Sequence, residues 1–239
     1  MLTRKAIWSF VLVGVFTGAA FGAPIVASLD LTDFHSLTDV IAQGIQVGDK
    51  LFDDFLFIPS GTQPTIVPNS DMIQVTGVFI NGDYGLKFNG GWSAGGGQIA
   101  ATSMTYSVTV LDPQMQIDGM ELWTSGVGVL GTDQDGRVTI IENLLPTDPG
   151  LGYAPPLVPQ IPEVYYHDGT DHVLQTSASI ALRDKVWVLT GVTVNGGYLA
   201  TGSAQLHEFY QTFSQIPEPA TLGLLGIGGL AVLVRRRKK

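Results

Sequence analysis

The chain contains no cysteine. Disulfide scaffolds, thiolate metal sites and cysteine nucleophiles are therefore excluded. A domain that folds without disulfides is held together by an ordinary hydrophobic core, and such a core requires a reasonably large domain.

Basic residues are scarce as well. Seven of the twelve Lys and Arg lie at the two ends of the chain, so the segment between the ends holds five basic and twenty acidic residues, a net charge of −15 (5 − 20). Nucleic-acid-binding proteins neutralise phosphates with Lys and Arg. We therefore expect no nucleic-acid partner. The five basic residues are Lys50, Lys87, Arg137, Arg183 and Lys185.

Lys and Glu are also rare in this central segment, whereas the chain has 30 Gly and 13 Pro, a balance that favours strands and turns over helices. Within 105–111, Tyr106, Val108 and Val110 alternate with Thr and Ser, which predicts one buried and one solvated face. Short runs separated by turn signals predict an all-β, antiparallel β-sandwich or jelly roll. The predicted strands cover residues 50–58, 72–80, 84–88, 98–100, 105–111, 116–123, 126–130, 137–142, 172–182, 186–195 and 204–213.

One short helix is predicted within residues 30–48. Ser36 is a candidate N-cap with Asp39 three residues later, apolar residues follow, and Gly44 stands at the expected end.

The first 22 residues have the three parts of a secretory signal. A basic start at Arg4 and Lys5 precedes an uncharged apolar run, and Ala20 and Gly22 then form a small-x-small cleavage site. We expect signal peptidase to remove residues 1–22. The alternative is an uncleaved membrane anchor, for which the apolar run is short.

The other end combines a short motif, an apolar run and a basic cluster. Pro217, Glu218 and Pro219 precede the apolar residues 220–234, and residues 235–239 are all Arg or Lys. Fifteen residues in a helix extend about 22 Å, so they would cross a bilayer core of roughly 30 Å only marginally. The positive-inside rule keeps the basic cluster in the cytoplasm and the body outside. The alternative is an ordinary single-pass tail anchor.

This end resembles the PEP-CTERM sorting signal of exported bacterial proteins. The resemblance implies that an exosortase recognises Pro217, Glu218 and Pro219, and that the basic tail retains the precursor until processing. It also implies a protein anchored in the membrane before processing and then delivered to the cell surface or extracellular matrix. The tail residues concerned are Arg235, Arg236 and Arg237.

The body resembles, more loosely, a group of secreted planctomycete-type PEP-CTERM proteins. The similarity lies in residues 47–55, 104–110 and 213–215. It implies a β-rich fold and an exported destination, and it implies no chemistry.

The expected organisation is a signal peptide at 1–22, a β-sandwich domain at 23–215 and a sorting signal at 216–239. Six prolines between 145 and 170 predict a long loop within the single domain.

Aromatic residues are the best candidates for ligand contact, because the apolar face of a sugar ring packs on an aromatic ring. Trp92 lies in a Gly-rich segment expected to be a turn, so we expect it to be exposed, with Tyr84 nearby as a second glycan contact. Trp123 and Trp187 are further candidates, but the alternation around Trp187 places it in the core.

Metal ligation is weakly indicated. Asp133 and Asp135 offer two carboxylates in a tight turn, which suits calcium, but a plain hairpin turn explains them equally and no EF-hand pattern follows. The segment 167–172 holds two His and two Asp, which would need a special loop geometry to converge on a metal. We expect no cofactor, with calcium as the open alternative.

No catalytic motif stands out. The chain has no serine-centred nucleophile elbow, and with twenty acidic residues in the body, pairs of carboxylates are expected by chance. The sequence favours a non-enzymatic structural or binding protein of the cell surface or extracellular matrix. A carbohydrate-binding module is the alternative that would make an extracellular polysaccharide a partner, and a glycoside hydrolase or lyase is a further one.

Overall fold

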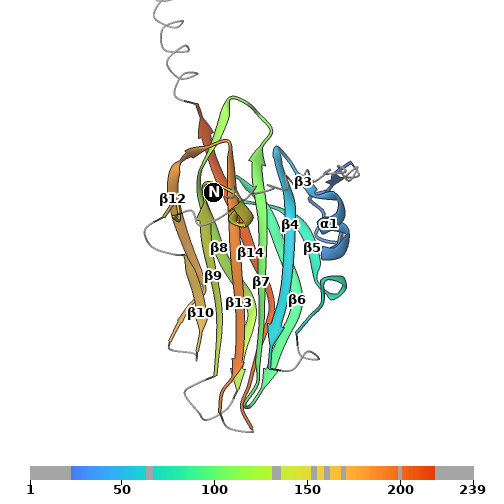
Figure 1. The fold of residues 1–239 in the computed structure, drawn as a ribbon, viewed down its shortest axis with the longest axis vertical. Helices are drawn as coiled ribbons and strands as arrows, with labels where there is room; N and C mark the ends of the chain where they lie inside the picture. Colours follow the sequence, from blue (N-terminus) through green and yellow to red (C-terminus); the bar gives the residue numbers. More distant parts are fainter. Residues whose placement is uncertain are drawn as a thin grey trace, which may run out of the picture.

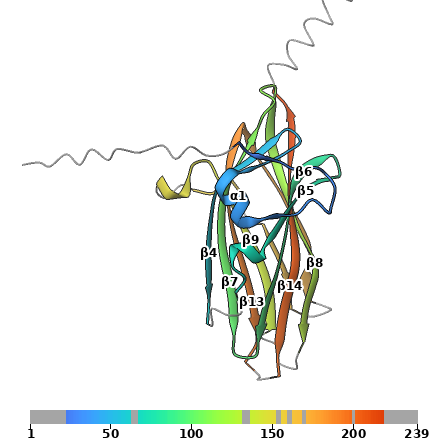
Figure 2. The same ribbon diagram turned by 90° about the vertical axis from the view of Figure 1, so that its right-hand side faces the viewer.

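A computed structural model describes residues 23–62, 67–130, 136–151, 155–158, 162–167, 171–198 and 201–218. Within these residues the chain forms two large sheets that pack face to face, with one short α-helix beside them (Figures 1 and 2). The predicted all-β sandwich is confirmed.

The first sheet, sheet A, has the strand order β1-β3-β4-β7-β13-β9-β10-β11. Its pairs are antiparallel except for β1 and β3, which run parallel at one edge. Its strands are β1 (Ile25–Val26), β3 (Ile45–Val47), β4 (Lys50–Gly61), β7 (Ile99–Val110), β13 (Lys185–Gly196), β9 (Gly136–Leu145), β10 (Glu163–Tyr166) and β11 (His172–Val173).

The second sheet, sheet B, has the order β12-β8-β14-β6-β5-β2, and all of its pairs are antiparallel. The long strand β14, the last one described, lies at the centre of this sheet between β8 and β6. Its strands are β12 (Gln175–Arg183), β8 (Met115–Leu130), β14 (Ser203–Pro217), β6 (Asp83–Gly95), β5 (Gln74–Ile80) and β2 (His35–Ser36).

The predicted helix is present as α1 (Leu37–Gln43). The Ser36 hydroxyl accepts a hydrogen bond from the backbone N–H of Asp39, and Gly44 ends the helix with a positive φ of 70°. Leu37 and Val40 are buried and anchor the helix to the sandwich. Two single 3-10 turns, η2 (Ser70–Met72) and η3 (Pro149–Leu151), complete the described helices.

Aromatic rings fill the space between the sheets. Tyr106 of sheet A packs against Phe52, Phe55 and Phe88, and Phe88 stacks on Phe209 at a centroid distance of 5.0 Å. Buried aliphatic side chains from both inner faces surround these rings. Burial on this scale makes the core the main source of stability in a protein without disulfides.

The turn expected in the Gly-rich segment before Trp92 is wrong, because residues 89–91 lie inside β6. Leu206 of β14 pairs with Trp92, and Glu208 pairs with Asn89, so β6 holds one residue more than its partner between these two pairs. Gly91 takes up the irregularity with a φ of 57°. The Gly-Gly signal therefore marks a β-bulge within a continuous strand.

Other predicted boundaries also move. The runs 98–100 and 105–111 belong to one strand, β7, and the runs 116–123 and 126–130 both belong to β8, whereas the run 172–182 divides into β11 and β12. The loop predicted at 145–170 contains the strand β10, which pairs with β9 in sheet A. Val164 of this strand is buried, so part of the segment belongs to the core.

The structure contains no helix that is long and apolar enough to cross a membrane among the residues that it describes. The helices expected at 1–22 and 220–234 lie outside those residues.

Candidate functional site

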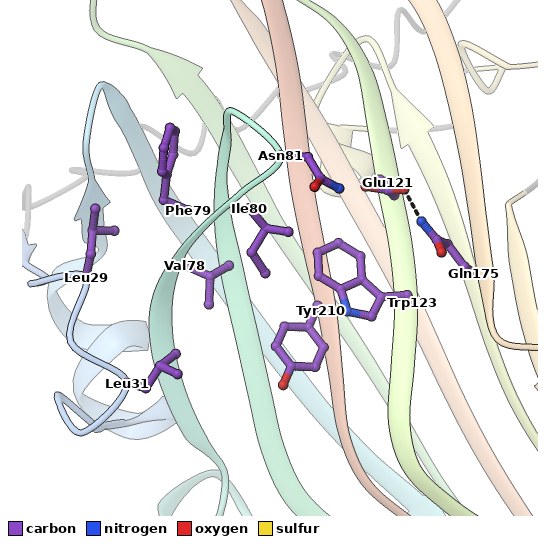
Figure 3. Close-up of a pocket in the computed structure, with 10 residues that line it drawn as sticks. All are labelled: Leu29, Leu31, Val78, Phe79, Ile80, Asn81, Glu121, Trp123, Gln175 and Tyr210. Atoms are coloured by element: carbon purple, nitrogen blue, oxygen red, sulfur yellow. Dashed lines mark hydrogen bonds between the residues drawn. The ribbon is translucent and has the colours of Figure 1, made fainter.

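A groove of about 650 Å³ lies on the outer face of sheet B (Figure 3). It is lined by side chains from β5, β8, β12 and β14, by the turn after β5, and by the segment between β1 and β2. The lining residues are Leu29, Leu31, Val78, Phe79, Ile80, Asn81, Glu121, Trp123, Gln175 and Tyr210.

The register of sheet B places the groove residues in two neighbouring rows. Gln175, Trp123 and Tyr210 are direct partners across β12, β8 and β14. Two residues earlier in β8, Glu121 pairs with Thr212 of β14. Because side chains alternate along a strand, residues two apart share a face, and both rows point outward.

Gly85 of β6 continues the second row. It pairs with Thr212 on one side and with Val78 on the other. A Cβ at Gly85 would approach the backbone carbonyl oxygen of Gln211 to 2.0 Å, so glycine is what allows β14 to lie close to β6 here. Val78, the partner of Gly85 in β5, is buried and lines the groove.

Trp123 and Tyr210 form the aromatic floor of the groove. Their ring centroids lie 5.0 Å apart and the ring planes differ by 4°. Figure 3 shows the two rings side by side with their faces turned the same way. Parallel, offset rings of this kind stabilise each other and present one flat apolar surface.

Hydrogen bonds hold the Tyr210 ring in place. Its hydroxyl donates to Glu208 Oε1 over 2.7 Å, and the Ser125 hydroxyl donates to the same oxygen. Lys87 Nζ lies 3.7 Å from the other carboxylate oxygen. Burial, followed by the hydrogen bond to Glu208, raises the pKa of Tyr210 to about 12, so the phenol is neutral at ordinary pH.

Glu208 itself remains a carboxylate. Burial alone would raise its pKa, but the hydrogen bonds from Ser125 and Tyr210 and the nearby Lys87 charge outweigh burial and lower the pKa. The acceptor that orients Tyr210 is therefore charged at neutral pH.

Polar groups lie at one end of the aromatic floor. The Gln175 amide donates to the Glu121 carboxylate, as the dashed line in Figure 3 marks, and Asn81 is exposed beside them. Together they offer amide donors and acceptors and one carboxylate next to an apolar surface. A flat ring with a rim of hydroxyl groups would match this arrangement.

Apolar side chains form the opposite wall. Leu29 and Leu31 come from the segment between β1 and β2, and Phe79 of β5 is 50% exposed. These side chains extend the apolar lining of the groove beyond the aromatic floor.

The expectation that Trp92 is an exposed platform is wrong. The bulge at Gly91 turns Trp92 toward the core, where it is 2% exposed, packs on Phe209 and donates its indole N–H to Thr102 over 3.2 Å. Tyr84 is half-buried and packs on Phe79 at 4.6 Å, at the edge of the region that holds the groove.

Trp187, expected in the core, lies on the outer face of sheet A instead. It lines a second hollow of about 520 Å³ with Leu56, Ile58 and Leu189, and Lys185 Nζ lies 5.0 Å from its ring centroid. The two hollows therefore lie on opposite faces of the sandwich.

The weak metal candidates gain no support. Asp133 and Asp135 lie outside the described residues. The described part of the chain holds no group of three or more His, Asp or Glu arranged to bind a metal ion. In the segment 167–172, His167 Nδ1 lies 3.4 Å from Asp171 Oδ2, and the Tyr165 hydroxyl donates to Asp171 Oδ1 over 3.1 Å.

The expected sorting residues are described only in part. Pro217 is the last residue of β14, and the backbone N–H of Glu218 donates to the carbonyl of Gln114 over 2.8 Å. Pro219 and the basic residues Arg235, Arg236 and Arg237 lie outside the described residues.

Two solved structures give matches with low TM-scores. One is TmCBM61 in complex with beta-1,4-galactotriose, with 10% identity and a TM-score of 0.28 over 66% of this chain and 88% of that chain. The other is a family two carbohydrate esterase from Cellvibrio japonicus, with 8% identity and a TM-score of 0.23 over 69% of this chain and 36% of that chain. Scores this low say nothing about function.

A search of curated proteins finds no match to the chain. At the C-terminus, by contrast, residues 215–238 match a family described as the PEP-CTERM protein-sorting motif. The resemblance seen in the sequence is confirmed for this segment, and the motif implies export and processing by an exosortase. The chain thus carries a PEP-CTERM sorting motif whose match begins within the last described strand of the β-sandwich.

Proposed function

We propose that this exported protein binds a neutral polysaccharide at the cell surface or in the extracellular matrix, through the groove on sheet B, and that it is not an enzyme. The observation that carries the proposal is the parallel pair of Trp123 and Tyr210 rings on the floor of the groove. Signal peptidase would remove residues 1–22, the segment 220–234 would hold the precursor in the membrane, and an exosortase would process the tail.

The chemistry of a sugar ring fits the groove. One face of a pyranose presents C–H groups that pack on an aromatic surface, while its hydroxyl groups lie at the rim and need hydrogen-bond partners. Trp123 and Tyr210 supply the surface, and Gln175, Glu121 and Asn81 supply the partners at one end. Because Glu208 fixes the Tyr210 hydroxyl, little side-chain freedom is lost when a ligand binds.

Binding without hydrolysis is supported by the count of carboxylates. Most glycoside hydrolases use two carboxyl groups about 5 to 9.5 Å apart on either side of the scissile bond. Among the described residues that line the groove, Glu121 is the only carboxylate, and it accepts a hydrogen bond from Gln175.

The test compares two tryptophans on opposite faces. Residues 23–218 are screened against an array of neutral and acidic polysaccharides, and the best ligand is titrated against wild type, Trp123→Ala and Trp187→Ala. We expect Trp123→Ala to weaken binding at least about tenfold, roughly 1.4 kcal/mol, because the flat surface is lost.

Trp187→Ala is the matched control, since it removes an indole from the outer face of sheet A and should leave the affinity unchanged. Equal losses in the two variants, or no binding to any polysaccharide on the array, would contradict the proposal. Release of shorter sugars by the wild-type protein would show that it is an enzyme.

A further inference from the structure

The sorting motif begins inside the folded domain. Residues 215–217 are the end of β14 and pair with β8, where Gln215 faces Ile117 and Pro217 faces Met115. One residue further on, the Glu218 N–H still donates to Gln114. Two of the three residues of the motif are therefore held by sheet B, with no linker between them and the last strand of the sandwich.

A cluster of three side chains, which we name the clamp, fixes this end of β14. Lys50 Nζ donates to Gln215 Oε1 over 2.9 Å and to Asp49 Oδ1 over 3.3 Å. The Gln215 amide in turn donates to Asp49 Oδ2. The three side chains thus form a closed ring of hydrogen bonds that ties β14 to the turn between β3 and β4.

The charged group of the clamp, the Lys50 ammonium group, is buried. Lys50 is 1% exposed, and its ammonium group lies 5.4 Å from the centroid of the Tyr84 ring. A buried ammonium group is costly unless it is paired and hydrogen-bonded. If the end of β14 separated from β8, the buried Lys50 ammonium group would lose its hydrogen bond to Gln215, and water could not easily replace it. Separation therefore costs more free energy than the loss of the backbone hydrogen bonds of β14 alone.

The backbone conformation at Gly48 allows the side chains of the clamp to approach one another. Gly48 begins the turn with a φ of 58° and lies directly beneath the Tyr84 ring, where a Cβ would approach the ring carbons to 2.4 Å. A larger residue would push Tyr84 off Lys50 and displace Asp49. Only glycine allows this close approach.

We propose that the clamp holds the sorting motif against the sheet, so that the processing enzyme gains access to Pro217 and Glu218 only after the end of β14 separates from β8. An enzyme that acts on a peptide chain must reach its backbone in an accessible, extended form, and here β8 occupies one side of it. Lys50, Asp49 and Gln215 are then positioning residues that set the rate of processing.

The test uses the full-length precursor, produced in a host with an exosortase that accepts its motif, and follows the loss of the tail by mass spectrometry. Lys50→Met removes the buried charge, and Gln215→Ala removes both hydrogen bonds of the amide. We expect each to speed the loss of the tail by about tenfold, because the closed state loses its main restraint.

Two further variants separate access from general stability. Gln98→Ala removes an amide that accepts a hydrogen bond from Gly95 at the far end of β6, and should leave the rate unchanged. Four Gly and Ser residues inserted between Gln215 and Ile216 free the motif from the sheet, so processing should be fast whether or not the clamp is intact.

Hydrogen exchange on the wild-type domain gives a readout that depends on no variant. The Glu218 amide should exchange at least about tenfold more slowly than in an unfolded peptide, and Gln215→Ala should remove most of this protection. Exchange of the wild-type Glu218 amide at the unfolded rate, or equal processing of the wild-type and inserted chains, would overturn the proposal. Neither result depends on whether the groove binds a polysaccharide.

Discussion

At the scale of single residues, one carboxyl group lies fully inside the sandwich. Glu142 of β9 is 0% exposed, and its Oε1 accepts a hydrogen bond from Thr190 over 3.1 Å. Thr190 accepts in turn from Gln211, and Gln211 accepts from the Tyr106 hydroxyl, so the network joins the two sheets. Among the described residues, Oε2 of Glu142 has no hydrogen-bond partner. Burial raises the pKa of Glu142 from 4.5 to about 8, which keeps the group protonated at neutral pH.

Glu142 should make the protein less stable as the pH rises. Between about 4.5 and 8 the folded state holds the proton and the unfolded state releases it, so the free energy of unfolding falls through this window. Glu142→Gln keeps the acceptor for Thr190 and cannot ionise. We expect the variant to match the wild type near pH 4 and to exceed it above pH 8 by on the order of a few kcal/mol.

Urea unfolding of both proteins across this pH range measures the difference. Thr190→Val provides the comparison, because it removes the hydrogen bond but leaves the ionisable group, so its pH dependence should persist. A gap between wild type and Glu142→Gln that is the same at every pH would show that the carboxyl group does not titrate as described.

The tryptophans show which features of the candidate site can be predicted from the sequence and which cannot. Chemistry alone identified Trp123 as a candidate for stacking on sugar, but nothing in the sequence indicated that Tyr210 would lie beside it. The pairing of β8 and β14 joins residues far apart in the chain, and no local pattern reports it. Trp92 and Trp187 were assigned to the wrong environments, because one bulge or one shift of register reverses which face a side chain occupies.

At the scale of elements, glycines decide where strands bend. Gly91 has a positive φ of 57° and free space around its Cα, so a side chain would meet no neighbour but would strain the backbone. Gly91→Ala should therefore destabilise the protein by about 1 to 2 kcal/mol through conformation alone. Ser93→Ala, at an exposed position in the regular part of the same strand, should change the stability by less than about 0.5 kcal/mol.

Thermal unfolding of the two variants distinguishes the effects. If both lower the melting temperature equally, the bulge is not under the strain that its φ implies. A larger fall for Gly91→Ala would support the conclusion that the bulge at Gly91 is what turns the Trp92 side chain inward.

The strands and the helix of the fold were predictable to different degrees. The helix α1 was identified with its cap and its end, because Ser36 and Gly44 act through local hydrogen bonds. Alternation predicts the long strands, but the Gly-Gly and other Gly-containing runs predict breaks at positions where the ladder continues through them. The strand β10 was missed, because its four residues lie among prolines and are fixed by pairing with β9 rather than by their own pattern.

At the scale of the whole molecule, the surface charge selects the kind of polymer that can bind. The body between the two ends carries a net charge of −15 (5 − 20), and the groove itself contributes Glu121. A net negative charge repels polyanions and slows their approach, whereas it leaves an uncharged ligand unaffected. This is why a neutral polysaccharide is the proposed ligand.

Salt should separate these two classes of ligand. Raising the ionic strength from about 0.01 M to about 1 M shortens the Debye length from roughly 30 Å to roughly 3 Å and screens the field of the body. Affinity for the neutral polysaccharide should stay within about twofold over this range, because stacking on Trp123 and Tyr210 and hydrogen bonding carry no net charge. Any binding to an acidic polysaccharide should be weakest at low salt and grow as salt is added. Binding that is strong at low salt and falls steeply with added salt would instead require a basic surface, which a body with five Lys and Arg does not provide.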